Sequence, residues 1–216
     1  MKKKKKLILP KKIKVGGTVY DIIETNKQTE DENIGYHDGH VSTIMLSRKA
    51  FGDIRPDSRI LETLLHEIFH AIDFVYCRDP MSEDLITSLS YSWFDFLVHN
   101  DLMLDSKKLP KKIRCRGFVY DVVYPACEVT QMDSGNLFST TNHNALKIFI
   151  RKFRKESVYY IKAKFLYSIG NLIMTRDSSI NEDTRNIVSD SAFLGGVFQV
   201  LLDTKLDKLI REWCKE

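Results

Sequence analysis

The sequence predicts an α+β fold of two tandem modules, each a short β-sheet followed by two helices. An internal repeat is the first observation behind this prediction: Leu-Pro-Lys-Lys-Ile stands at 9–13 and again at 109–113, and Tyr-Asp at 20–21 and again at 120–121. In both halves, β-branched runs typical of strands precede apolar residues at the three- and four-residue spacing of helices. Such a repeat indicates a duplicated structural unit. We therefore expect one module over residues 1–104 and a second over residues 105–216.

Each half is expected to begin with a β-branched strand, which Gly16-Gly17 interrupts in the first half. A polar loop then leads to a second strand, at 42–46 or at 146–150. Two helices follow, at 58–77 and 82–98 in the first half and at 157–175 and 181–203 in the second. The helix at 82–98 has an apolar stripe at helical spacing, which we interpret as core: Leu85, Ile86, Leu89, Trp93, Phe96 and Leu97.

The helix expected at 58–77 is amphipathic. Its apolar stripe faces the core and consists of Ile60, Leu61, Leu64, Leu65, Ile68, Ile72 and Val75. Its polar side carries Glu62, His66, His70 and Asp73. Asp57 and Ser58 offer N-cap oxygens at its start, and Pro80 closes the segment because the residue before a proline disfavours helical backbone.

His66, Glu67 and His70 form the most informative motif, a His-Glu-x-x-His run inside this helix. Four residues advance a helix by roughly 400°, so the two imidazoles project from one face and can bind one tetrahedral Zn²⁺. Glu67 lies one position further round, where its carboxylate reaches a metal-bound water rather than the metal. We predict a zinc site with His66 and His70 as ligands and Glu67 as the catalytic residue.

Several motifs of the first half occur together in one known group of proteins. They are 13–17 with Tyr20, the Gly-Tyr-His-Asp loop at 35–38, the strand at 44–46, the helix segment from Glu62 to Asp73 and the end of the second helix at 97–100. In these features residues 9–101 resemble small zinc metallopeptidase-like proteins of phages and mobile elements, broadly related to the ImmA/IrrE group. The resemblance implies a minimal α+β zincin, in which the motif helix supplies two zinc ligands and the next helix an acidic third. The second half resembles the same fold only through the first, with its motif lost.

The third ligand is where the chain departs from this pattern. The position that usually carries the better acidic ligand in the resembling group holds Thr87, which cannot replace a carboxylate. Glu83 lies one turn earlier on the same face and is our predicted ligand, although acids in a first helical turn are also common because they complement the helix dipole. Asp73 lies roughly 10 Å along the helix from His66, so it fits better as a partner that orients His70 or as a surface acid.

Length and composition favour a globular protein with a sizeable core, since 43% of its 216 residues are hydrophobic. No apolar run approaches the roughly 18 residues that cross a bilayer, and the apolar run at 7–9 is too short for a signal peptide. The four cysteines form no Cys-x-x-Cys pair and indicate reduced thiols. We expect a cytoplasmic protein without membrane association, located in the host cytoplasm if it is encoded by a phage.

Charge is divided unevenly between the halves. Residues 1–104 hold 14 Lys and Arg against 16 Asp and Glu, a net charge of −2, whereas 105–216 hold 19 against 13, a net charge of +6. The basic cluster in the second half consists of Lys147, Arg151, Lys152, Arg154 and Lys155. It could face nucleic acid or an acidic protein, but no nucleic-acid motif accompanies it, and a solvated strand end is the favoured interpretation. His37 and His40 could line the cleft or belong only to a polar turn.

Two functions follow from these observations. In the first, the chain is a zinc-dependent peptidase that hydrolyses a specific intracellular protein, and the second repeat recruits substrate or stabilises the first. In the second, it is a catalytically inactive interaction protein of a phage or mobile element that binds and inhibits a host factor. The intact His66, Glu67 and His70 favour the enzyme, whereas Thr87 and the lost second motif favour the binder.

Overall fold

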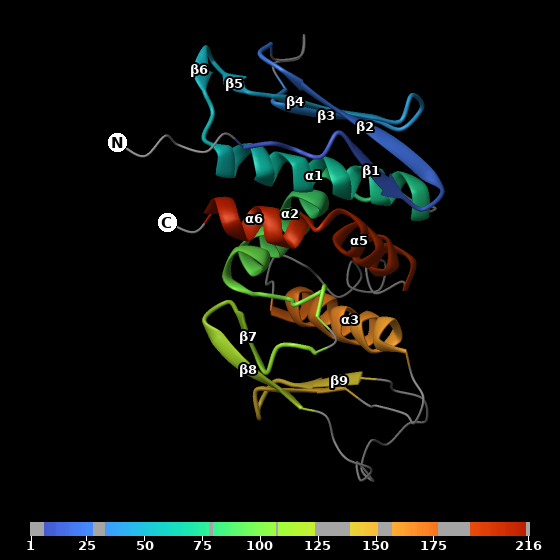
Figure 1. Ribbon diagram of the computed structural model, residues 1–216, viewed down its shortest axis with the longest axis vertical. Helices are drawn as coiled ribbons and strands as arrows, with labels where there is room; N and C mark the ends of the chain where they lie inside the picture. The colour runs from blue at the N-terminus through green and yellow to red at the C-terminus, as the bar shows by residue number, and fades with distance from the viewer. Residues whose placement is uncertain are drawn as a thin grey trace.

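The protein is described by a computed structural model, in which residues 7–27, 33–77, 80–106, 108–123, 139–150, 157–176 and 191–214 are placed (Figure 1). These residues form an α+β structure, as the sequence predicts, with five helices and three small sheets in the described ranges.

The first sheet contains β1 (Lys12–Val15), β2 (Thr18–Thr25), β3 (Gly35–Asp38) and β4 (Thr43–Ser47) in the order β1-β2-β4-β3. β1 and β2 form an antiparallel hairpin, β2 and β4 are parallel, and β3 returns antiparallel to β4. Gly16 has a φ of +59° in the turn of the hairpin, a conformation that glycine adopts without strain. β3 therefore lies at an edge of this sheet.

The second sheet repeats this arrangement with β7 (Lys112–Cys115), β8 (Phe118–Val123), β9 (Ser139–Asn142) and β10 (Lys147–Ile150). Its order is β7-β8-β10-β9, and its pairing directions match those of the first sheet. The hairpin registers agree as well, because Ile13 faces Tyr20 and Ile113 faces Tyr120. The internal repeat of the sequence thus corresponds to two sheets of the same topology.

The helices are α1 (Asp57–Tyr76), α2 (Glu83–His99), α3 (Val158–Arg176), α5 (Ser191–Thr204) and α6 (Leu206–Cys214). The first three agree closely with the predicted ranges, whereas the sequence did not predict α6. Part of the helix predicted at 181–203 lies outside the described residues, and α5 covers its later part.

The predicted N-cap of α1 is wrong. Pro56 occupies the cap position without a side-chain hydrogen bond, and Asp57 instead forms an ion pair of 3.1 Å with Arg48. In α2, by contrast, the Ser82 hydroxyl accepts a hydrogen bond from the Leu85 backbone N–H.

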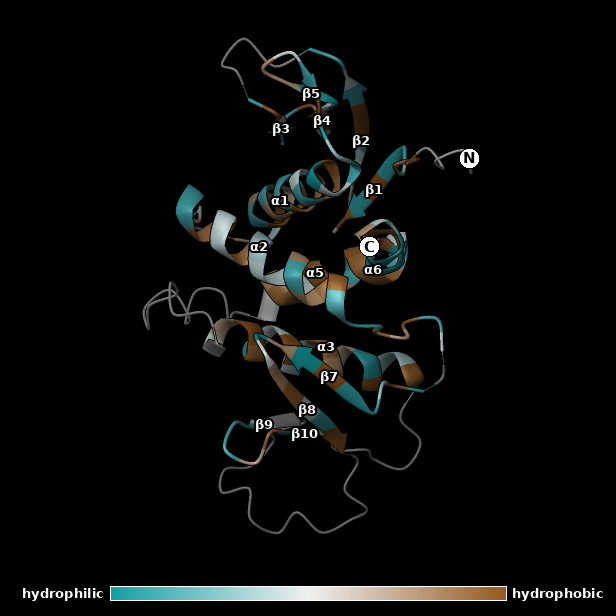
Figure 2. Ribbon diagram, turned by 90° about the vertical axis from the view of Figure 1, so that its left-hand side faces the viewer, coloured by the Kyte–Doolittle hydropathy of each residue, from teal (hydrophilic) through white to brown (hydrophobic). Residues whose placement is uncertain are grey.

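The two halves share one core. α1 lies against the first sheet, α3 against the second, and α2, α5 and α6 fill the space between them (Figure 1). α5 and α6 belong to the second half of the chain but pack on α1, where the rings of Phe69 and Phe193 meet edge to face at 5.5 Å. Hydrophobic stretches of α5 accordingly lie in the middle of the molecule in Figure 2. The motif helix is thereby held between the first sheet and the helices of the second half.

A small hairpin that the sequence did not predict projects beyond the first sheet, beside the start of α1 (Figure 1). It pairs β5 (Lys49–Ala50) with β6 (Asp53–Ile54) in antiparallel fashion.

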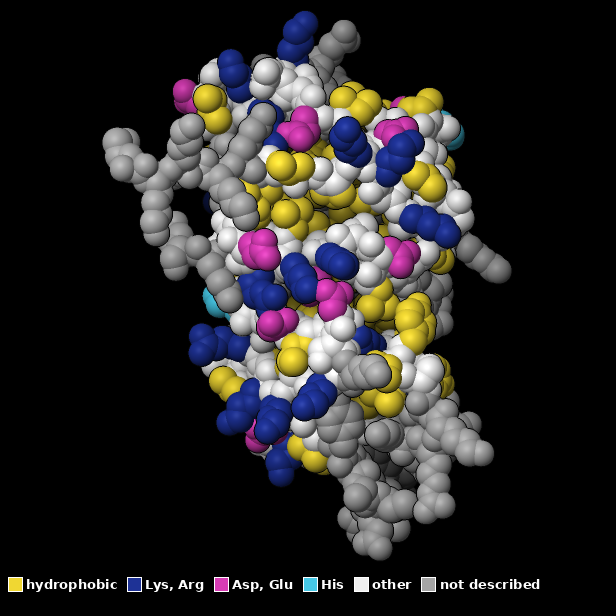
Figure 3. Space-filling view, in the orientation of Figure 1, with side chains coloured by type: hydrophobic (Ala, Val, Ile, Leu, Met, Phe, Trp, Pro, Cys, Tyr) yellow, Lys and Arg dark blue, Asp and Glu magenta, His cyan; other side chains and the backbone are white. Residues whose placement is uncertain are grey.

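The basic cluster is described only at Lys147, an exposed residue at the start of β10, because its other members fall outside the placed residues. Lys and Arg side chains gather over the region of β7 and β8 on the face shown in Figure 3, where Lys112 and Arg114 are exposed. In the ranges that the structure describes, no helix has the length and apolar content needed to cross a membrane.

Candidate metal centre

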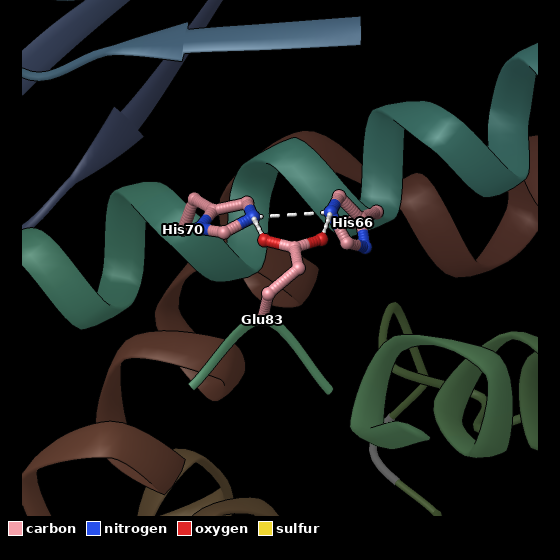
Figure 4. Close-up of side chains that lie close together, drawn as sticks. All are labelled: His66, His70 and Glu83. Atoms are coloured by element: carbon pink, nitrogen blue, oxygen red, sulfur yellow. Dashed lines mark hydrogen bonds and ion pairs between the residues drawn. The ribbon is translucent and has the colours of Figure 1, made fainter. Parts of the chain in front are cut away.

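α1 and the first turn of α2 bring the three predicted ligands together (Figure 4). The Nε2 atoms of His66 and His70 lie 3.0 Å apart, one helical turn from each other on α1. The two carboxylate oxygens of Glu83 lie 3.1 Å from these nitrogens, one oxygen to each. The structure thus brings together the three residues that the sequence predicts as metal ligands.

The donor set fits a zinc ion in number and chemistry. Two imidazole nitrogens and one carboxylate form the three-ligand set of many catalytic zinc sites. Bonds of roughly 2.0–2.1 Å at tetrahedral angles would place the ligand atoms about 3.4 Å from one another. The observed separations of 3.0 and 3.1 Å therefore need to widen by only a few tenths of an ångström around an ion. A fourth position stays available for water or substrate.

Ser90 of α2 fixes the orientation of the His66 ring. Its hydroxyl donates to the Thr87 carbonyl at 2.9 Å, so its oxygen is left to accept from Nδ1 of His66 at 3.4 Å. A proton on Nδ1 leaves the Nε2 lone pair directed at Glu83 and His70. Burial, and next the neighbouring His70, lower the pKa of His66, which favours the neutral ring that binds metal.

Glu67 lines the same cleft as His66, His70 and Glu83 but is buried, with only 6% of its surface exposed. Burial, with a further contribution from the charge of Glu83, raises the pKa of Glu67 to about 8. The edge strand β3 passes directly over this carboxyl group: a Cβ at Gly35 would lie 2.4 Å from Glu67 Oε1 and equally close to Thr63. Only glycine at this position lets the strand approach the motif helix so closely.

Asp73 does not have either of the roles predicted from the sequence. It is 7% exposed, so it is not a surface acid, and the structure shows it bound to Met81 rather than to His70. Both carboxylate oxygens lie 3.2 Å from the Met81 backbone N–H, two residues before Glu83. Helical periodicity could not reveal this contact, because Met81 lies beyond the end of α1.

The cleft around the ligand group has a volume of about 770 Å³. β3 forms one wall, α1 the floor, α2 the opposite wall, and the stem of the β5–β6 hairpin one end. Arg55, which sequence reasoning missed, joins these walls: its guanidinium is buried and donates to the carbonyls of Ile34 and Ser47 and to the Thr63 hydroxyl. The cleft therefore has a rigid frame.

The sequence also singled out Thr87, His37 and His40, and the structure describes all three. The Thr87 hydroxyl donates to Glu83 Oε1 at 3.4 Å, so this residue supports the ligand that it cannot replace. His37 lines the cleft with its ring parallel to that of His70 at 6.4 Å, and burial, followed by the charge of His70, lowers the pKa of His37 to about 4. His40 packs edge-on against Phe74 and does not line the cleft.

Comparison of the chain with protein-family models, with curated proteins and with solved structures finds no match.

Proposed function

We propose that the protein is a zinc-dependent peptidase. The observation that supports this proposal most strongly is the convergence of His66, His70 and Glu83 on one point, with the buried carboxyl of Glu67 beside them in an open cleft. Zinc bound there would lower the pKa of a coordinated water and polarise a peptide carbonyl. Cytoplasmic location remains part of this proposal.

Glu67 is the group that moves protons in this mechanism. Its carboxylate takes the proton of the attacking water and later delivers it to the amine that leaves. A cation at the three ligands favours the ionised form of this carboxyl, so metal binding opposes the rise in pKa that burial causes. Glu67 is thus set to exchange a proton near neutral pH.

The edge of the first sheet offers a binding site for an extended substrate. Among the described residues, β3 pairs only with β4 and has its other edge along the cleft. A peptide can add to such an edge as a further strand through main-chain hydrogen bonds. Its scissile carbonyl would then lie over α1, beside His66 and His70.

We also propose that the chain consists of two zincin-like modules of the kind seen in phages and mobile elements, the second of which has lost its site. Tyr167, Ser168 and Asn171 of α3 stand at the positions that correspond to His66, Glu67 and His70. Because α5 and α6 pack on the motif helix, stabilisation of the first module is a better supported role for the second than recruitment. The proposed substrate is one specific intracellular protein.

The test compares the zinc-loaded wild type with Glu67→Gln on a mixture-based peptide library, with new termini read by mass spectrometry. Gln keeps the size of the side chain and removes the base, so cleavage should fall by roughly 10²–10⁴-fold while zinc is retained. Cleavage of equal rate by both proteins, or by neither, would contradict the peptidase. Zinc binding without any cleavage would favour the interaction protein that inhibits a host factor.

A further inference from the structure

The β5–β6 hairpin, residues 49–54, presents two large apolar side chains to solvent. Phe51 is 82% exposed and Ile54 is 81% exposed, which are the highest values among the exposed large hydrophobics of the described residues. The hairpin projects beyond the first sheet (Figure 1). Exposed apolar residues that gather at one projection often mark an interaction site.

The backbone conformation in the turn of this hairpin is unfavourable for Phe51. Phe51 has a φ of +51° and Gly52 a φ of +89°. Turns with positive φ at both central residues favour Asn-Gly or Asp-Gly, and a bulky side chain in this region is strained. An exposed phenylalanine in this conformation is expected to lower both conformational stability and solubility. Strain of this kind gathers at functional sites.

The base of the hairpin is held firmly, although its tip is exposed. The backbone N–H of Arg55 donates to the Arg48 carbonyl at 2.9 Å, and the buried Arg55 side chain donates to the Ser47 carbonyl at 2.8 Å. The Ser47 hydroxyl donates to the Lys49 carbonyl at 2.6 Å. The tip is therefore a preorganised projection, and a ligand that binds it need not order the stem.

The hairpin continues the cleft that contains the proposed zinc ligands. Ala50, Arg55 and Pro56 line that cleft at the end where α1 begins. Ile34, the residue before β3, and Tyr36 of β3 line the same cleft and are 37% and 42% exposed. The hairpin that carries Phe51 and Ile54 thus adjoins one end of the cleft, where it could meet an extended chain bound along β3.

We propose that Phe51 and Ile54 form an exosite that holds an apolar side chain of an extended polypeptide substrate, beyond the residues next to the scissile bond. This inference rests on the proposed peptidase function. From Asp57 to His66 the helix rises about 13 Å, whereas three extended residues reach only about 10 Å. A substrate must therefore continue past its third residue from the cleaved bond to reach the hairpin.

The experiment uses reduced, carboxymethylated α-lactalbumin as an unfolded protein probe for the zinc-loaded protein. The main cleaved bond is identified by mass spectrometry, and two peptides centred on it are made, one of 20 residues and one of six. Phe51→Asn and Ile54→Asn are compared with the wild type. Val41→Asn is the matched control, because Val41 is a 67% exposed apolar residue of another turn and does not line the cleft.

In Phe51→Asn and Ile54→Asn, the KM for the long peptide should rise about tenfold, the equivalent of roughly 1.4 kcal/mol, and kcat/KM for the hexapeptide should stay within about twofold of the wild type. Phe51→Asn should also keep or raise the Tm, because Asn tolerates positive φ. An unchanged KM for the long peptide, or an equal rise with Val41→Asn, would overturn the exosite alone. If the wild type cleaves none of the probes, the peptidase proposal fails and the exosite fails with it.

Discussion

At the scale of single residues, burial strongly changes the pKa of Glu67. Its pKa rises from an ordinary 4.5 to about 8. Between these pH values the folded, metal-free protein keeps a proton that the unfolded chain releases. The free energy of unfolding therefore decreases as the pH rises through this window. Gln has no such proton, so Glu67→Gln removes this part of the pH dependence.

Urea unfolding of the chelator-treated wild type and Glu67→Gln at pH 5 and pH 8 tests this prediction. The free energy of unfolding of Glu67→Gln minus that of the wild type should be larger at pH 8 than at pH 5. The other ionisable groups are the same in both proteins, so the difference between the two proteins isolates the contribution of Glu67. A difference that does not change with pH would show that Glu67 is ionised, or exposed, in the folded protein.

The sequence identified the residues that meet at the candidate metal centre but missed the residues that support them. His66, Glu67 and His70 share one short motif, so helical geometry alone places them together. Ser90 and Gly35 act through contacts between α1 and other elements, and their spacing in the sequence contains no sign of these contacts. Glu83 lies between these cases, because the sequence identified it as an acid near the start of a helix but could not show whether it faces His66 and His70.

At the scale of elements, a contact between α1 and the residues just before α2 holds the start of α2, which carries Glu83. Asp73 is in the last turns of α1, and its carboxylate accepts from the Met81 N–H, two residues before Glu83. It therefore joins the histidine-bearing helix to the segment that carries the acidic ligand. Outer contacts of this kind typically change metal affinity by about 10–100-fold.

Asp73→Ala should lower zinc affinity by at least about tenfold, whereas Asp73→Asn should retain most of it, because the amide oxygen can still accept from Met81. Zinc affinity is measured by competition with a chromophoric chelator. Asp95→Ala is the control, since this acid lies on the exposed side of α2, where it pairs with His99. Equal zinc affinity in Asp73→Ala and Asp95→Ala would show that Asp73 does not position Glu83.

Periodicity predicts the long elements well and the short ones poorly. α1 and α2 have apolar stripes over several turns, and the structure places both within about two residues of their predicted ends. β3 reads Gly-Tyr-His-Asp, and its strand conformation comes from pairing with β4 rather than from β-branched residues. The β5–β6 hairpin has two-residue strands, too short for any alternating pattern.

At the scale of the whole molecule, the second half of the chain completes the environment of the motif helix. Phe193 of α5 is 1% exposed and meets Phe69, a residue inside the His-Glu-x-x-His motif. Gln199 of α5 accepts hydrogen bonds from the Gly16 N–H at 2.9 Å and the Tyr76 hydroxyl at 3.0 Å. These contacts predict that both halves unfold together.

Phe193→Ala should lower the free energy of unfolding by about 3–5 kcal/mol, because it leaves a cavity beneath α1. Tyr159→Ala is the control: this aromatic residue is 64% exposed, so its loss should cost within about 0.5 kcal/mol. Urea unfolding followed by tryptophan fluorescence, which reports Trp93 and Trp213, measures both variants. Two separate transitions, with that of the first half unaffected by Phe193→Ala, would show that the halves are independent.

The central claim is that His66, His70 and Glu83 together bind one zinc ion, and zinc titration of chelator-stripped protein by calorimetry tests it most directly. The wild type should bind one zinc per chain, His66→Ala with His70→Ala should abolish binding, and Glu83→Ala should weaken it by at least about tenfold. Asp84→Ala removes a neighbouring acid of the same helical turn, so it should lose only the dipole contribution of about 0.3–1 kcal/mol to stability and keep zinc affinity. A wild type that binds no zinc, or a Glu83→Ala variant that binds it as tightly as Asp84→Ala, would contradict the account.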